Sequence, residues 1–118
     1  MTPNELLKVA VKAADGKLAS DIEVLDIHEL TTIADYFVIC NGNSATQIRA
    51  IAEEIELKCK DAGEAPLSTE GYQASSWVLL DFGSVIVHIF RKEMREFYSI
   101  ERLWNEAPRM DVKTILGE

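Results

Sequence analysis

The sequence predicts a domain of the α/β (α+β) class, in which helices pack on a small mixed β-sheet. Three observations predict it. Two segments begin with a helix-capping signature and continue with apolar residues at helical spacing. Residues 36–42 form an unbroken apolar run, as expected of a central strand that is buried on both faces. Residues 75–90 alternate around a glycine turn, which is typical of a β-hairpin.

Length and composition indicate one domain spanning residues 1–118. Of the 118 residues, 47% are hydrophobic and 27% are charged, as in globular proteins that build a core without disulfides or metal. No apolar run approaches the ~20 residues that cross a bilayer, and the first residues lack the pattern of a signal or transit peptide. A cytoplasmic protein is therefore expected, with Cys40 and Cys59 as buried thiols.

The first helix is predicted to begin at Pro3 and to end near Gly16. Thr2-Pro3-Asn4-Glu5 is a capping box with proline at the first helical position. Apolar residues then follow at helical spacing: Leu6, Leu7, Ala10, Val11 and Ala14. Two strands are predicted next, at residues 22–27 and 36–42.

The longest helix is predicted after a second capping box, Ser44-Ala45-Thr46-Gln47, and closes at Gly63. Its inward stripe comprises Ile48, Ile51, Ala52, Ile55 and Cys59. A polar loop at residues 64–75 leads to the hairpin, and a short last helix is predicted from about Ser99 to before Pro108. Residues 109–118 show no clear period and are expected to form a flexible tail.

The predicted order is helix, strand, strand, helix, strand, strand, helix. A strand–helix–strand crossover from residue 36 to residue 82 is expected to be right-handed and to place its two strands parallel. The hairpin then adds an antiparallel strand. We expect the long helix to cover one face of the resulting sheet.

The hairpin has two unlike faces, because successive side chains of a strand point to opposite sides of a sheet. One face is aliphatic and should turn toward the long helix: Val78, Leu80, Val85, Val87 and Ile89. The other face mixes aromatic and polar groups and should be less fully covered: Trp77, Leu79, Asp81, Ile86, His88 and Phe90. It is either core beneath the helix that carries Trp104, or a contact surface for a partner.

Charge is unevenly distributed along the chain. Residues 1–90 carry 6 Lys/Arg and 14 Asp/Glu, whereas residues 91–118 carry 6 of each, so the whole net charge of −8 lies in the first ninety residues. An acidic body repels phosphate backbones, which disfavours direct nucleic-acid binding. It favours a basic protein partner, although acidity for solubility alone is the other explanation.

Motifs for catalysis are weak in this chain. Asp81 lacks the second strand carboxylate with which nucleotidyl transfer holds two metal ions. Asn43 and Ser44 precede a helix and could hold a phosphate, but they also read as a strand end and a helix cap. Neither histidine has a neighbour at metal-ligand spacing. No catalytic residue, metal or cofactor is predicted.

Four motifs occur together without gaps in this chain: Asp35-Tyr36-Phe37, Gly42-Asn43-Ser44, the hairpin at residues 77–90, and residues 95–98. In this combination the sequence resembles the Iojap family, also called the ribosomal silencing factor family. The similarity runs from the first helix to about residue 111.

The resemblance implies a fold similar to that of nucleotidyltransferases, without transferase activity, and a homodimer. It implies binding to the large ribosomal subunit through universal large-subunit ribosomal protein fourteen, a small basic protein at the intersubunit face. Occupying that surface would block joining of the small subunit and repress translation when nutrients are scarce. A partner-binding set is inferred from the second hairpin face and the motif positions: Trp77, Asp81, His88, Phe90, Arg91, Arg95 and Tyr98.

Two hypotheses therefore stand at the level of sequence. One is a non-enzymatic factor that keeps ribosomal subunits apart. The other is a nucleotide-binding or nucleotidyltransferase-like enzyme that uses Asn43, Ser44 and Asp81.

Overall fold

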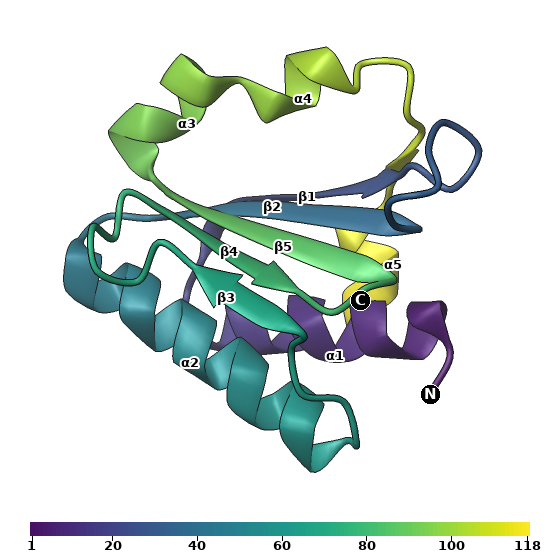
Figure 1. Ribbon diagram of the computed structural model, residues 1–118, viewed down its shortest axis with the longest axis horizontal. Coiled ribbons are helices and arrows are strands. Elements are labelled where there is room, and N and C mark those ends of the chain that lie inside the picture. The colour runs from purple at the N-terminus through teal and green to yellow at the C-terminus, as the bar shows by residue number, and fades with distance from the viewer.

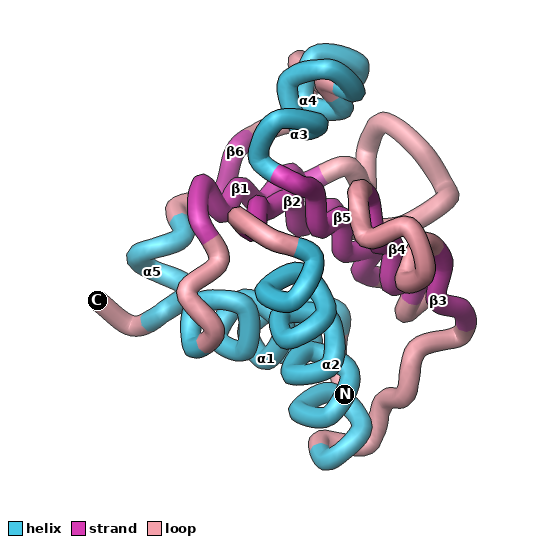
Figure 2. Tube along the Cα trace, turned by 90° about the vertical axis from the view of Figure 1, so that its left-hand side faces the viewer, coloured by secondary structure: helices cyan, strands magenta, loops and turns pink.

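A six-stranded sheet lies between two unequal helical layers in the computed structural model, which describes residues 1–118 (Figure 1). The strand order is β3-β4-β5-β2-β1-β6. The strands are β1 (Ser20–Asp26), β2 (Tyr36–Gly42), β3 (Ser68–Glu70), β4 (Trp77–Asp81), β5 (Val85–Arg91) and β6 (Arg109–Met110). The helices are α1 (Pro3–Gly16), α2 (Ala45–Asp61), α3 (Lys92–Tyr98), α4 (Ile100–Leu103) and α5 (Val112–Leu116). Helices α1, α2 and α5 cover one face of the sheet, and the short helices α3 and α4 cover the other (Figure 2). The predicted fold class is confirmed.

Both predicted capping boxes start helices. The Thr2 hydroxyl accepts the N–H of Glu5 at 3.1 Å, and the Glu5 carboxylate accepts the N–H of Thr2 at 3.2 Å. At α2 the Ser44 hydroxyl accepts the N–H of Gln47 at 3.1 Å. The Gln47 side chain, however, accepts the N–H of Asn43 and donates to the carbonyl of Leu18, so it also ties α2 to the loop after α1.

The larger core lies beneath the aliphatic face of the hairpin. It comprises 21 buried residues, including the predicted stripes of α1 and α2 and all five aliphatic hairpin residues. Strands β4 and β5 pair in the register Trp77↔Phe90 to Asp81↔Ile86, which places the turn at Gly83-Ser84. The predicted sorting of the hairpin into two faces is confirmed.

The predicted strand directions need one correction. The parallel neighbour of β2 is β5, and β4 is antiparallel to β5, so the first hairpin strand runs opposite to β2. The reason is β3, a short exposed strand within the segment expected to be a loop. It is antiparallel to β4 and therefore parallel to β2. The crossover through α2 thus delivers its parallel strand as β3 at the far edge of the sheet, and the chain then turns back twice.

The C-terminal segment also differs from the expectation. Residues 109–110 form β6 at the edge next to β1, and α5 packs on α1 with Ile115 in the larger core. This segment is therefore packed against the domain and is not a free tail. Its two elements are too short to show a period in the sequence. They are held by tertiary contacts, as short isolated helices are marginal in water.

Candidate functional site

The mixed face of the hairpin forms an aromatic cluster beneath α3 and α4. The ring of Trp77 is stacked on Phe90 with centroids 5.0 Å apart, and Tyr98 of α3 lies 4.6 Å from Trp77. The rings of Phe37 and Trp104 form a T-shaped pair with centroids 5.4 Å apart. A second core of nine buried residues results, with Trp77, Leu79 and Trp104 half-buried at its margin.

The structure brings together four of the seven residues predicted to bind a partner: Trp77, His88, Phe90 and Tyr98. Their exposure contradicts part of the prediction, because Phe90 is fully buried and His88 is only 5% exposed. The face is less fully covered than the aliphatic one, as expected, because Trp77, Leu79 and Asp81 stay partly exposed. Its buried residues nevertheless form a core with Ile100 of α4, which is the alternative that the sequence left open. Of the aromatic set, only Tyr98 and part of Trp77 reach the surface.

His88 is held as a neutral side chain. The indole N–H of Trp77 donates to His88 Nδ1 at 3.2 Å, and because an indole nitrogen is only a donor, Nδ1 must be unprotonated. The proton of the neutral ring is then on Nε2, which is buried without a hydrogen-bond partner. Burial lowers the pKa of His88 to about 4, opposed by the negative charge of Glu101. His88 is therefore a structural residue at neutral pH.

We expect His88 to make the protein acid-sensitive. Below its ordinary pKa of 6.5 the unfolded chain binds a proton that the folded chain excludes until about pH 4. The contribution to stability is thus complete above pH 6.5 and is lost as the pH falls toward 4, by about 2 kcal/mol between pH 7 and pH 5. Urea titrations at both pH values should show this loss for the wild type and a smaller one for His88→Asn, which keeps an acceptor near Nδ1. His28, whose pKa is raised by its contact with Asp26, is present in both proteins and cancels. Equal pH dependence would contradict the assignment.

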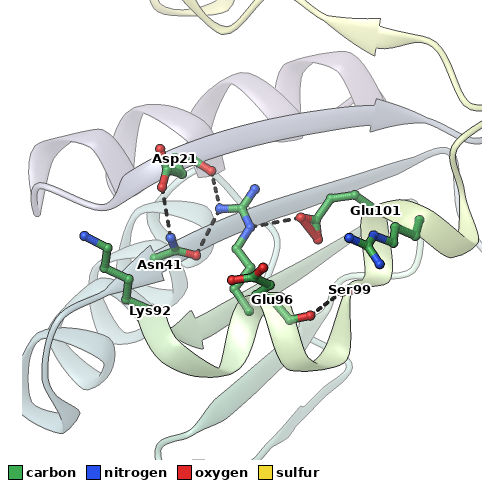
Figure 3. A pocket seen from close by; sticks show the side chains of 8 residues that line it. Asp21, Asn41, Lys92, Glu96, Ser99 and Glu101 are labelled. Carbon is green, nitrogen blue, oxygen red and sulfur yellow. Dashed lines mark hydrogen bonds and ion pairs between the residues drawn. The ribbon is translucent and has the colours of Figure 1, made fainter.

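Arg95 fastens α3 to the sheet. Its guanidinium donates to Asn41 Oδ1 at 3.0 Å, to Glu101 Oε2 at 3.2 Å and to the carbonyl of Asp21 (Figure 3). It also donates to Glu23 Oε2 at 2.9 Å. Asp21 lies where the pairing of β1 with β2 shifts register. The Arg95 side chain is 10% exposed, so these bonds link β1, β2, α3 and α4 in a partly dry environment. Arg95 is therefore a structural clamp and is not free to bind a partner directly.

An open polar pocket of about 330 Å³ surrounds this clamp. Its lining combines three cations with three carboxylates: Lys92, Arg95 and Arg102, and Asp21, Glu96 and Glu101, beside Asn41 and Ser99. Within this lining Arg95 forms an ion pair with Glu101, and the side-chain amide of Asn41 donates to Asp21.

The groups of the enzyme hypothesis lie at opposite ends of the sheet. Asn43 and Ser44 follow the C-terminal end of β2. Asp81 pairs with Ile86, which in turn pairs with Phe37 near the N-terminal end of β2. A strand of this length separates its ends by roughly 20 Å, too far for one nucleotide site. Locally, Asp81 accepts the N–H of Gly83 at 2.8 Å and closes the hairpin turn, while Ser44 caps α2.

Arg91, the last predicted residue, is half-exposed at the end of β5. Its backbone N–H donates to the carbonyl of Ser76 at 2.9 Å, and its side chain lies 3.6 Å from Glu93.

The loop before β4 requires glycine at position 71, because a Cβ atom at Gly71 would lie 2.0 Å from the carbonyl oxygen of Trp77. A positive φ of 87° also favours glycine there.

Two exposed apolar residues of the helical cover were missed by the sequence reasoning. Phe97 is 76% exposed and Leu103 is 78% exposed. Hydrophobic periodicity cannot find them, because in α3 the usual order is reversed: the charged Arg95 faces inward and the phenylalanine faces outward. The only available signal is the density of aromatic residues at 97–104.

The fold and this face define a mixed α/β domain whose second sheet face is a closed aromatic core under a short helical cover. The whole chain, residues 1–118, matches the family described as ribosomal silencing factor during starvation, RsfS. It is 43% identical over 112 residues to the ribosomal silencing factor RsfS of Bacillus subtilis, covering 95% of both proteins. The chain belongs to this family.

Solved structures and more distant relatives agree with this placement. A crystal structure of a protein from Chromobacterium violaceum is 34% identical and superposes with a TM-score of 0.87, covering 89% of this chain and 88% of the other. A mouse protein named mitochondrial assembly of ribosomal large subunit protein 1 is 34% identical over 91 residues, which cover 73% of this chain and 39% of that protein.

Family membership gives the protein a ribosome-associated silencing role and places it among regulators of translation. No helix has the length and apolar character needed to cross a membrane.

Proposed function

We propose that the protein binds the large ribosomal subunit through universal large-subunit ribosomal protein fourteen and sterically blocks joining of the small subunit. Translation is thereby repressed when nutrients are limiting. The observation that carries this proposal is the family match over all 118 residues. The large subunit is also the particle named in the mouse relative.

Charge supports a protein contact over direct contact with RNA. The net charge of −8 belongs to residues 1–90, where 14 Asp/Glu outnumber 6 Lys/Arg. Such a surface attracts a small basic protein and is repelled by a phosphate backbone. We therefore expect the protein to contact a ribosomal protein and to make little direct contact with nucleic acid.

The geometry of the polar groups supports a role without catalysis. Asp81 closes a turn, Ser44 caps a helix and the two lie at opposite ends of the sheet. His88 is buried, and its pKa is lowered to about 4 by burial. The protein is accordingly proposed to act by occupying a surface of the large subunit, with no cofactor. We further propose that it is a homodimer and works in the cytoplasm.

We expect the protein to lower the yield of joined ribosomes when it is added to large subunits before small subunits. Sucrose gradients with isolated subunits measure both the joined fraction and co-sedimentation of the protein with each subunit. The expected pattern is co-sedimentation with large subunits only and a dose-dependent loss of joined particles. Addition after joining is the matched control and should have a weaker effect, because the site is then occupied by the small subunit. Unchanged joining at saturating protein would refute the proposed function.

A further inference from the structure

Part of the mixed hairpin face lies beyond the helical cover. Helix α3 packs on β5 and β2, whereas β4 and β3 continue to the edge of the sheet (Figure 2). On β4, Leu79 and Asp81 of this face are half-exposed, while Val78 and Leu80 on the opposite face are fully buried. The cover thus leaves part of the sheet open along this edge.

The open part of the face combines residues of β3 and β4. In their antiparallel register Glu70 lies opposite Leu79, and Ser68 lies opposite Asp81. Directly opposite residues of two such strands share one face of the sheet. These four side chains therefore form one surface, which we call the β3–β4 strip. Trp77 adjoins the strip but belongs to the aromatic cluster beneath α3.

The strip carries negative charge without a counter-charge. Neither Glu70 nor Asp81 forms an ion pair. The Asp81 carboxylate accepts the N–H of Gly83 through Oδ1, which leaves Oδ2 free. The surrounding segment, residues 61–90, contains four Asp/Glu and no Lys or Arg. The strip is thus one of the places where the acidity of the body is open to a partner.

The chemistry of the strip fits a basic protein. Leu79 offers an apolar contact, and the carboxylates of Glu70 and Asp81 beside it are acceptors for Lys or Arg side chains. Charge complementarity therefore selects a partner with a cationic surface, whereas a phosphate backbone is repelled. This is the same attraction that the acidic body as a whole exerts on a basic partner.

We propose that the β3–β4 strip is the surface that docks on the basic ribosomal protein of the large subunit. This inference rests on the proposed function and names the contact residues for it. Glu70, Leu79 and Asp81 touch the partner. The contact thereby moves from the buried centre of the hairpin face to the edge of the sheet, and Asp81 is retained from the predicted partner-binding set.

The test reverses the same charge on opposite faces of the molecule. Glu70→Lys should weaken binding to isolated large subunits at least about tenfold, because repulsion replaces attraction at the contact. Glu53→Lys is the matched control, since Glu53 is an exposed carboxylate on α2, which covers the other face of the sheet. It should change the affinity by less than about threefold, because charges distant from the contact are screened by salt. Urea midpoints of both variants should match the wild type, since exposed side chains contribute little to stability.

A second variant removes charge and preserves the turn. Asp81→Asn keeps Oδ1 as the acceptor of the Gly83 N–H but loses the negative charge. It should weaken binding by about tenfold, the usual effect of losing a hydrogen bond between charged groups. Added salt should weaken the wild type more steeply than it weakens Glu70→Lys or Asp81→Asn.

The possible outcomes separate the strip from the proposed function. If the wild type binds large subunits and Glu70→Lys binds equally well, the strip is not the docking surface, while the proposed function stands. Equal losses in Glu70→Lys and Glu53→Lys mean attraction by net charge alone and also overturn the inference. If Glu70→Lys converts a dimer to a monomer in light scattering, the strip is a seam between two copies and the inference is overturned. If the wild type does not bind large subunits at all, the proposed function fails and the inference falls with it.

Discussion

Arg95→Ala is expected to lower the free energy of unfolding by about 3–5 kcal/mol, the usual cost of removing one member of a buried ionic network. The guanidinium is 10% exposed and holds three side chains and one backbone carbonyl. Its loss leaves Asn41, which is buried, without its donor and leaves Glu101 with an uncompensated charge. Urea denaturation followed by circular dichroism measures the effect.

Two matched variants distinguish the clamp from a simple loss of positive charge. Arg102→Ala removes an exposed arginine from α4 and should change the free energy of unfolding by no more than about 0.5 kcal/mol. Glu23→Gln should cost less than about 1 kcal/mol, because the Glu23 side chain is 40% exposed and its ion pair is screened by water. If Arg95→Ala costs no more than Arg102→Ala, the clamp does not stabilise the cover.

Trp77→Ala is expected to cost about 3–5 kcal/mol of folding free energy. It removes the stacking on Phe90 and the contact with Tyr98, and large-to-small changes in a core typically cost this much. It also leaves the buried Nδ1 of His88 without a donor. The midpoint of urea denaturation should therefore fall steeply, and the cover should lose its support.

Trp77→Phe isolates the hydrogen bond from the packing. Phenylalanine keeps an aromatic ring against Phe90 but has no N–H for His88, so we expect a loss of about 1–3 kcal/mol. Large-subunit affinity, measured on the folded fraction, should be nearly unchanged for Trp77→Phe. A large loss of affinity with unchanged stability in either variant would show that Trp77 contacts the partner and does not mainly support the cover.

Local patterns in the sequence were sufficient for much of the fold. The capping signatures at Thr2 and Ser44 and the apolar stripes behind them predict α1 and α2, because a helix start depends on bonds between residues three apart. The alternation in residues 77–90 predicts both faces of the hairpin, since the period of a strand is fixed by its backbone. Strand direction was predicted less well, because the three-residue strand β3 leaves no pattern and reverses the chain once more.

The candidate site separates more clearly what the sequence predicts from what tertiary contacts decide. The sequence by itself determined which hairpin residues share a face, where the acidic charge lies along the chain, and that Asp81 lacks a second carboxylate beside it. Only the tertiary structure decided that Phe90 and His88 are covered, that Arg95 points inward and that Phe97 points outward. The physical reason is that β1 and β2 supply the carboxylate, amide and carbonyl acceptors of Arg95 from positions 54 to 74 residues away in the chain. A charged side chain can be buried where distant segments meet its hydrogen-bonding needs, and no local period records that meeting.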